Sequence, residues 1–257
     1  MAETGSSVLV FGRRTGEPVV LKVVKHPGDE WLSGAVLSAF RGKGVVRVFD
    51  YADGALLLER LSPGESLAGL ALSGDDTGAT EILADVIGRM SPAETVDGFP
   101  SVEDWGRGFE RYKASAATGI PGQLLDEARD VYFELCRSQS HVRLLHGDLH
   151  QGNVLLDSER GWLAIDPKGV IGEPEYEVGA ALRNPLERPD LFLQRLAIRR
   201  RVDLFSARLD LDPGRMLAWS FAQAVLSAIW ALEDGLALDS HPWLAFAAVV
   251  RDLRPFL

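Results

Sequence analysis

The sequence has one cysteine, Cys136, among its 257 residues, so no disulfide bond can form within the chain. Apolar residues recur at helical spacing around Cys136, which favours packing of its thiol over reactivity. Basic residues are also scarce: 27 Lys and Arg face 37 Asp and Glu, giving a formal charge of −10. This balance argues against general affinity for nucleic acid or anionic membranes, which requires basic patches.

A recognisable signal peptide and a membrane span are lacking as well. Residues 1–7 have neither a basic start nor an apolar run. The longest uncharged run, residues 216–232, is shorter than a typical span and contains Ser220, Gln223 and Ser227. We therefore expect a buried helix at this position and a cytoplasmic protein.

What is present is an ordinary globular composition, with 46% apolar and 25% charged residues. The charge is unevenly distributed. Residues 1–61 carry 8 basic and 7 acidic side chains, a net charge of +1, whereas residues 62–257 carry 19 and 30, a net charge of −11. The acidic excess either keeps the protein soluble or binds a cationic partner, and the composition does not distinguish these two interpretations.

The first 61 residues have the pattern of a small antiparallel lobe. Two β-branched runs, 8–12 and 18–24, flank a turn and predict a hairpin. A helix is expected over 29–40, and two further strands over 45–49 and 55–59. Ser62-Pro-Gly64 then interrupts the pattern, so we place the lobe boundary there.

Helices dominate the remainder, residues 62–257. They are expected near 79–90, 102–117, 121–139, 190–208, 213–233 and 243–253, with a loop-and-strand section over 144–169. Antiparallel strands followed by a helical body predict an α+β protein of two lobes, 1–61 and 62–257.

The most informative segment is His-Gly-Asp-Leu-His-Gln-Gly-Asn, residues 146–153. Two strand-like runs, 154–156 and 163–165, follow it, and a hairpin between them would hold Asn153 close to Asp166. An amide oxygen and a carboxylate aimed at one point suit Mg²⁺. Asp148, just before the hairpin, could accept the proton of an attacking hydroxyl.

These residues resemble the catalytic loop and metal-binding aspartate of the protein-kinase-like fold. Their form is similar to that of the aminoglycoside phosphotransferases, and Ile165-Asp-Pro-Lys-Gly169 stands where protein kinases have Asp-Phe-Gly. Residues 170–185 look most like the streptomycin 6-phosphotransferase and hydroxyurea kinase branch. The resemblance runs from about residue 7 to the C-terminus. It implies a small antiparallel lobe with one helix and a larger, mainly helical lobe.

The resemblance also implies roles for individual residues. Asp148 would be the catalytic base, and Asn153 and Asp166 would bind magnesium. Lys22 matches the strand lysine that holds the α- and β-phosphates of ATP. Strand alternation sends Lys22 and Lys25 to opposite faces, so only one of them can serve. The linker between the lobes would meet adenine through backbone groups near Glu59 and Leu61.

Three features depart from the family pattern. No glycine-rich phosphate loop precedes the first hairpin, where Gly5-Ser-Ser7 is the only remnant. The first strand is expected to be short or missing. The acid that pairs with Lys22 is left open, because Glu30 is the only Glu of the predicted 29–40 helix and stands at its start.

Two histidines and two groups of acidic residues each allow a structural and a functional interpretation. His146 and His150 have a spacing that binds zinc on a helix, but Gly147 breaks helicity, so a structural role for His146 is favoured. Glu173, Glu175 and Glu177 belong to a surface loop or face a cationic acceptor. A second candidate acidic patch comprises Glu233, Asp234 and Asp239.

We therefore expect an ATP- and Mg²⁺-dependent kinase that phosphorylates a hydroxyl group of a small, cationic molecule such as streptomycin. Hydroxyurea is the rival acceptor, and it would need no acidic pocket. A catalytically weak pseudokinase and a zinc hydrolase are alternatives from other classes. The oligomeric state is left open.

Overall fold

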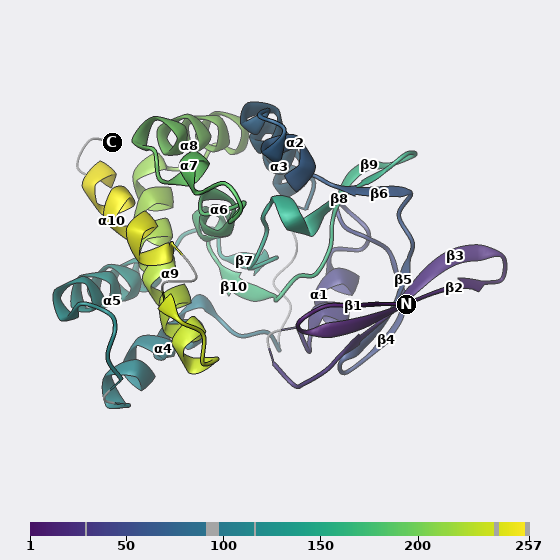
Figure 1. Ribbon diagram of the computed structural model, residues 1–257, viewed down its shortest axis with the longest axis horizontal. Helices are drawn as coiled ribbons and strands as arrows, with labels where there is room; N and C mark the ends of the chain where they lie inside the picture. The colour runs from purple at the N-terminus through teal and green to yellow at the C-terminus, as the bar shows by residue number, and fades with distance from the viewer. Residues whose placement is uncertain (29, 91–97, 116, 239–241, 255–257) are drawn as a thin grey trace. The chain divides into compact units, whose positions relative to one another are not determined.

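The computed structural model describes residues 1–28, 30–90, 98–115, 117–238 and 242–254, drawn as ribbon in Figure 1. The chain forms two compact units, and each unit is discontinuous in sequence. The first unit comprises residues 1–99 and 144–170, and the second comprises 100–143 and 171–257. This division does not coincide with a boundary at residues 61/62, and that lobe boundary stays a prediction.

A five-stranded antiparallel sheet forms the N-terminal part of the first unit. Its order is β1-β2-β3-β5-β4, with bounds β1 Ala2–Glu3, β2 Ser7–Arg14, β3 Glu17–Val24, β4 Val48–Ala52 and β5 Ala55–Glu59. The predicted hairpin of β2 and β3 is thereby confirmed, and the two further predicted strands are β4, which begins later than residue 45, and β5. In the β2–β3–β5 register, Lys22 of the central strand lies between Leu9 and Leu56.

Helix α1 (Ser33–Ala39) packs against β4. Gly34 permits this approach, because a Cβ atom there would lie 2.6 Å from the Cβ of Tyr51. The helix begins later than its predicted start. Glu30 lies ahead of it, where the Ser33 N–H donates to the Glu30 carbonyl in a turn.

A second, three-stranded sheet completes the strands of the first unit, in the order β6-β8-β9. Strands β8 (Val154–Asp157) and β9 (Gly161–Ala164) are the hairpin predicted after the 146–153 segment. A bridge from Val45 to Ala164 and a hydrogen bond from the Val46 N–H to the Ala164 carbonyl attach it to the N-terminal residues. These contacts explain why residues 144–170 belong to the first unit.

The remaining elements near this hairpin are short, except for helix α3. Strand β6 (Pro63–Ser66) was unexpected, because Ser62-Pro-Gly64 was interpreted only as a boundary. It is followed by α2 (Ala68–Leu72) and α3 (Asp76–Met90), and a 3₁₀ turn, Gln151–Asn153, leads into β8. Strands β7 (Arg143–Leu145) and β10 (Val170–Gly172) pair with each other.

The second unit is helical. Helix α9 (Pro213–Glu233) packs against α4 (Val102–Ala114), α5 (Gly122–Arg137), α6 (Pro174–Leu182) and α10 (Trp243–Leu253), and Figure 1 shows it running through this unit. It is long and apolar enough to cross a membrane, but 78% of its apolar stretch is buried within the protein. The helix is therefore part of the core, as the sequence predicted.

The helices of the second unit differ from the prediction at two places. The helix expected over 190–208 is divided into α7 (Pro189–Phe192) and α8 (Arg195–Leu209), because Gln194 between them is extended. Helix α6 was not predicted. Almost all its side chains are buried, so it has no polar face and no helical period in the sequence.

Candidate active site

Lys22 lies on β3 of the five-stranded sheet, and its side chain is only 2% exposed. Its Nζ lies 2.7 Å from Glu30 Oε2 and 2.9 Å from Asp166 Oδ1. Burial opposes the charged form, but the two carboxylates outweigh it, so the pKa of Lys22 is raised. Lys25, three residues later, instead pairs with Glu3 on the exposed surface.

Glu30 is the acid that pairs with Lys22, which the sequence left open. Its carboxylate reaches the lysine from the turn ahead of α1 and also receives a hydrogen bond from the Ser6 side chain. Burial opposes its ionisation, yet Lys22 prevails and the pKa of Glu30 is lowered. Ser6 belongs to the Gly5-Ser-Ser7 remnant, so this segment touches the lysine–glutamate pair.

His146 joins the two segments that carry the predicted catalytic and metal-binding residues. Its Nε2–H donates to the Ile165 carbonyl at 2.8 Å, and its Nδ1 accepts from the Asp148 N–H at 3.3 Å. Burial lowers the pKa of this fully buried imidazole to about 4, so the neutral ring is the stable form. Because both nitrogens are occupied, His146 is not available for a zinc site with His150.

Asn153 is held by the same loop. Its Nδ2 donates to the Asp148 carbonyl at 2.9 Å, and its own carbonyl accepts from the Ile165 N–H at 2.9 Å. Asp166 follows Ile165 with a φ of 56°, a left-handed conformation that Asp tolerates better than most residues. These contacts link Asp148, Asn153 and Asp166 within one network, as the hairpin predicted.

Lys168, which the sequence analysis left without a role, also reaches this network. Its N–H donates to the His146 carbonyl at 2.9 Å, and its Nζ lies 3.6 Å from Asp148 Oδ2. The signal for it was its place two residues after Asp166, in Asp-Pro-Lys-Gly. Sequence spacing could not predict the contact, because it depends on the turn that Asp166 makes.

The first unit therefore gathers three carboxylates, one amide and two ammonium groups in one connected set of contacts. Such a set can hold a polyphosphate through its lysines, hold a hard cation through its oxygens and accept a proton at Asp148. Comparisons with known proteins agree with that chemistry. Residues 1–235 match the family model described as aminoglycoside/hydroxyurea antibiotic resistance kinase.

The chain belongs to this kinase family. A streptomycin 3''-kinase of Klebsiella pneumoniae is 36% identical over 90% of this chain and 86% of its own. A streptomycin 6-kinase of Streptomyces glaucescens is 34% identical, with coverages of 96% and 81%. A hydroxyurea phosphotransferase of Kitasatospora aureofaciens is 31% identical, with coverages of 89% and 66%. The kinase is thus an ATP-dependent small-molecule phosphotransferase.

Solved structures show the same fold. A thermostable mutant of an aminoglycoside phosphotransferase, in ternary complex with AMP-PNP and hygromycin B, has a TM-score of 0.69. It is 18% identical, and the match covers 98% of the kinase and 92% of that chain. A choline kinase from Streptococcus pneumoniae has a TM-score of 0.64 at 13% identity, with coverages of 99% and 92%. The predicted protein-kinase-like fold is confirmed.

Glu59 and Leu61, the predicted adenine contacts, lie at the end of β5 and just beyond it. The Glu59 carboxylate accepts from the Arg47 N–H at 2.6 Å and pairs with Arg160. Its N–H donates to the Arg47 carbonyl. Leu61 is buried. The side chain of Glu59 is therefore occupied by neighbouring arginine residues, and contacts of the backbone with adenine stay a prediction.

Glu173 does not face solvent, which corrects the expectation that it contacts an acceptor. Its side chain is 0% exposed, and its carboxylate accepts hydrogen bonds from the side chains of Arg215 and Trp219 and from the Ser140 N–H. Glu177 is also buried, on α6. The sequence left a surface loop and an acceptor contact open for both residues, because α6 was not predicted. Glu175 is half-buried and is the one of the three that stays a candidate.

The second acidic patch is only partly described. Glu233, the last residue of α9, pairs with Arg111 Nε at 3.1 Å, and Asp234 follows it as the helix cap. Asp239 lies outside the described residues. The ion pair with Arg111 neutralises part of this patch.

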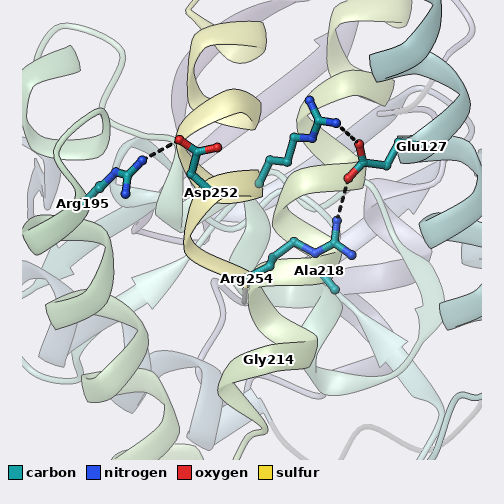
Figure 2. A pocket seen from close by; sticks show the side chains of 7 residues that line it. Glu127, Arg195, Gly214, Ala218, Asp252 and Arg254 are labelled. Carbon is teal, nitrogen blue, oxygen red and sulfur yellow. Dashed lines mark hydrogen bonds and ion pairs between the residues drawn. The ribbon is translucent and has the colours of Figure 1, made fainter. Parts of the chain in front are cut away.

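A cavity of about 840 Å³ lies in the second unit and is seen in Figure 2. Its arginines pair with its carboxylates: Arg195 with Asp252, and both Arg251 and Arg254 with Glu127. Figure 2 shows the pairs of Arg195 with Asp252 and of Arg254 with Glu127. None of the predicted site residues lines this cavity.

Proposed function

We propose that the kinase transfers the γ-phosphoryl group of ATP to a hydroxyl group of streptomycin or a closely similar cationic aminoglycoside. The observation that carries this proposal is the contact network joining Lys22, Glu30, Asp166, Asn153 and Asp148. The names of the two streptomycin kinases at 36% and 34% identity support the choice of acceptor.

Asp148 is the proposed base. The acceptor oxygen attacks the γ-phosphorus, its proton passes to the Asp148 carboxylate, and the bond between the γ-phosphorus and the bridging oxygen breaks. ADP leaves with the electron pair of that bond. Most of the rate enhancement in such reactions comes from positioning and charge stabilisation. The hydrogen bond from the Asp148 N–H to His146 supports a fixed position for this carboxylate.

Asn153 and Asp166 are the proposed magnesium ligands. The Asn153 amide nitrogen is engaged with the Asp148 carbonyl, which leaves the amide oxygen as the coordinating atom. Together with the carboxylate of Asp166 this gives the oxygen donors that Mg²⁺ prefers, with phosphate oxygens and water completing the shell. Bound there, the cation would neutralise charge on the phosphates.

Lys22 is proposed to hold the α- and β-phosphates of ATP, with adenine near the backbone of Glu59 and Leu61. The pairing of Lys22 with Glu30 supports an active kinase over a pseudokinase, because the lysine is oriented by a carboxylate. ATP supply also makes the cytoplasm the proposed location.

The acceptor is proposed to be cationic because residues 62–257 carry a net charge of −11. Glu175 is the carboxylate still proposed to contact it. Hydroxyurea is the second candidate, supported by the relative named hydroxyurea phosphotransferase. It is small and uncharged, so it would gain little from that acidic surface.

An acceptor panel tests the proposal. The purified kinase is incubated with ATP and Mg²⁺ and with streptomycin, hygromycin B or hydroxyurea, and ADP formation and the mass of each acceptor are measured. We expect streptomycin to gain one phosphoryl group. Phosphorylation of hydroxyurea alone would replace the first candidate by the second, and ADP formation independent of all acceptors would contradict both.

A further inference from the structure

The side chain of Lys168 lies beside Asp148, the proposed catalytic base. Its ammonium lies 3.6 Å from Asp148 Oδ2, and the two side chains are 25% and 27% exposed. Both groups are therefore partly exposed to a bound molecule, whereas the side chain of Lys22 is more deeply buried. The distance exceeds the 2.7 and 2.9 Å of the two Lys22 ion pairs, so this pair is looser.

The backbone of the same segment is fixed on both sides. The N–H groups of Lys168 and Gly169 both donate to the His146 carbonyl, and the Pro167 carbonyl accepts from Ser33 Oγ at 2.6 Å. Gly169 has a φ of +80°, and a Cβ atom there would lie 2.3 Å from Val36 Cγ2. These contacts limit where the Lys168 side chain can reach, and they use only backbone atoms of Lys168.

Lys22 and Lys168 interact with different groups of the network. Lys22 is buried between two carboxylates that it contacts directly. Lys168 also acts electrostatically on Glu30 and His146, so its ammonium lies within range of the Lys22–Glu30 pair as well as of Asp148. Its ammonium thus lies beside the proposed base and within electrostatic range of the Lys22–Glu30 pair.

We propose that Lys168 is a further catalytic residue, whose ammonium binds an oxygen of the γ-phosphoryl group while that group passes to the acceptor. This inference rests on the proposed function. In the transfer, the acceptor proton goes to Asp148 and Lys168 keeps its own proton throughout. A fixed cation at this position stabilises the negative charge on the transferring group, which is where such interactions contribute most to rate.

The competing interpretation is that the pair with Asp148 only orients the base. The affinities for AMP-PNP and ADP distinguish this interpretation from the proposed phosphate contact. Only a contact with the γ-phosphoryl group would lower the affinity for AMP-PNP without lowering that for ADP. The variants are Lys168→Met, which removes the charge, and Lys168→Arg, which keeps it. Lys25→Met is the matched control, since that lysine directly follows β3, has a side chain that is 26% exposed and pairs with Glu3.

We expect Lys168→Met to lower kcat by about 100-fold or more, the usual effect of losing one donor to transition-state charge. Its affinity for AMP-PNP should fall about tenfold while its affinity for ADP changes less than about twofold, for a charge-assisted contact to the γ-phosphoryl group alone. Lys168→Arg should recover part of kcat and of the AMP-PNP affinity. Thermal unfolding of every variant is followed to show that it is folded.

A kcat within about threefold of the wild type, or an equal loss of affinity for ADP and AMP-PNP, would overturn the inference. If Lys168→Met does not fold, Lys168→Gln is measured in its place, because it also removes the charge, and the same outcomes support or overturn the inference. A wild-type protein that binds neither nucleotide refutes the proposed function and this inference together. Wild-type binding with unaltered binding by Lys168→Met refutes this inference alone.

Discussion

His146 shows how one neutral side chain can fix two functional segments. It receives a hydrogen bond from the N–H of Asp148 and donates one to the carbonyl of Ile165, next to Asp166. Only the neutral ring, protonated at Nε2, can do both. A second proton on Nδ1 would turn the acceptor of the Asp148 N–H into a donor.

This arrangement predicts a pH-dependent stability. Burial lowers the pKa of His146 to about 4, whereas a solvated histidine titrates near pH 6.5. Between these values only the unfolded chain binds the proton, so the contribution is complete above about pH 6.5 and is lost as the pH falls towards 4. We expect it to decrease by about 2 kcal/mol between pH 7.5 and 5.0.

Denaturant unfolding at the two pH values measures this effect in the wild type and in His146→Gln. The variant should show a difference in unfolding free energy that is smaller by about 2 kcal/mol. His26→Gln is the control, because His26 is exposed. An identical pH dependence in the wild type and His146→Gln would refute the assignment.

At this scale the sequence predicted the residues that depend on local spacing. Asp148, Asn153 and Asp166 are connected because a short hairpin determines their separation. The partner of Lys22 and the contact of Lys168 could not be predicted, since both depend on turns. Glu30 reaches Lys22 from ahead of α1, and Lys168 reaches Asp148 after the left-handed Asp166.

Helix α6 changes which acidic residues can contact the acceptor. Pro174 begins it, and Gly179 lies so close to α9 that a Cβ atom would be 2.0 Å from Gln223 Oε1. A helix buried on nearly every side gives no alternation of apolar and polar residues. Its acidic residues therefore resembled a surface loop in the sequence, although Glu173 and Glu177 are buried.

Glu173 accordingly has a structural role that can be tested. Its buried carboxylate pairs with Arg215 at 2.6 Å, and Glu173→Gln would leave the guanidinium without its counter-charge. We expect a loss of about 3 kcal/mol in the free energy of unfolding, as for other broken buried ion pairs. At a temperature where the variant is folded, its KM for the acceptor should be unchanged.

Glu175→Gln is the matched control, because Glu175 lies in the first turn of α6, two residues after Glu173, and its side chain is half-buried. It should change stability by less than about 0.5 kcal/mol and raise the KM for a cationic acceptor. A raised KM together with normal stability in Glu173→Gln would restore Glu173 as an acceptor contact.

The whole chain combines a nearly neutral N-terminal segment with a strongly acidic remainder. The pattern of apolar residues predicts the strands and helices, and their order along the chain predicts the α+β, two-lobed fold. The division into units could not, because the hairpin after Asn153 pairs with residues far earlier in the chain. The net charge of −11 over residues 62–257, which already counts the arginine partners of Glu173 and Glu233, favours a cationic acceptor.

The measurement that tests the central claim most directly is transfer of ³²P from [γ-³²P]ATP to streptomycin by the wild type and by Asp148→Asn. The account predicts labelled streptomycin from the wild type and a rate at least about 1,000-fold lower from the variant, since the base is lost. Nucleotide binding by Asp148→Asn should be preserved. Transfer by Asp148→Asn at the wild-type rate would contradict the account.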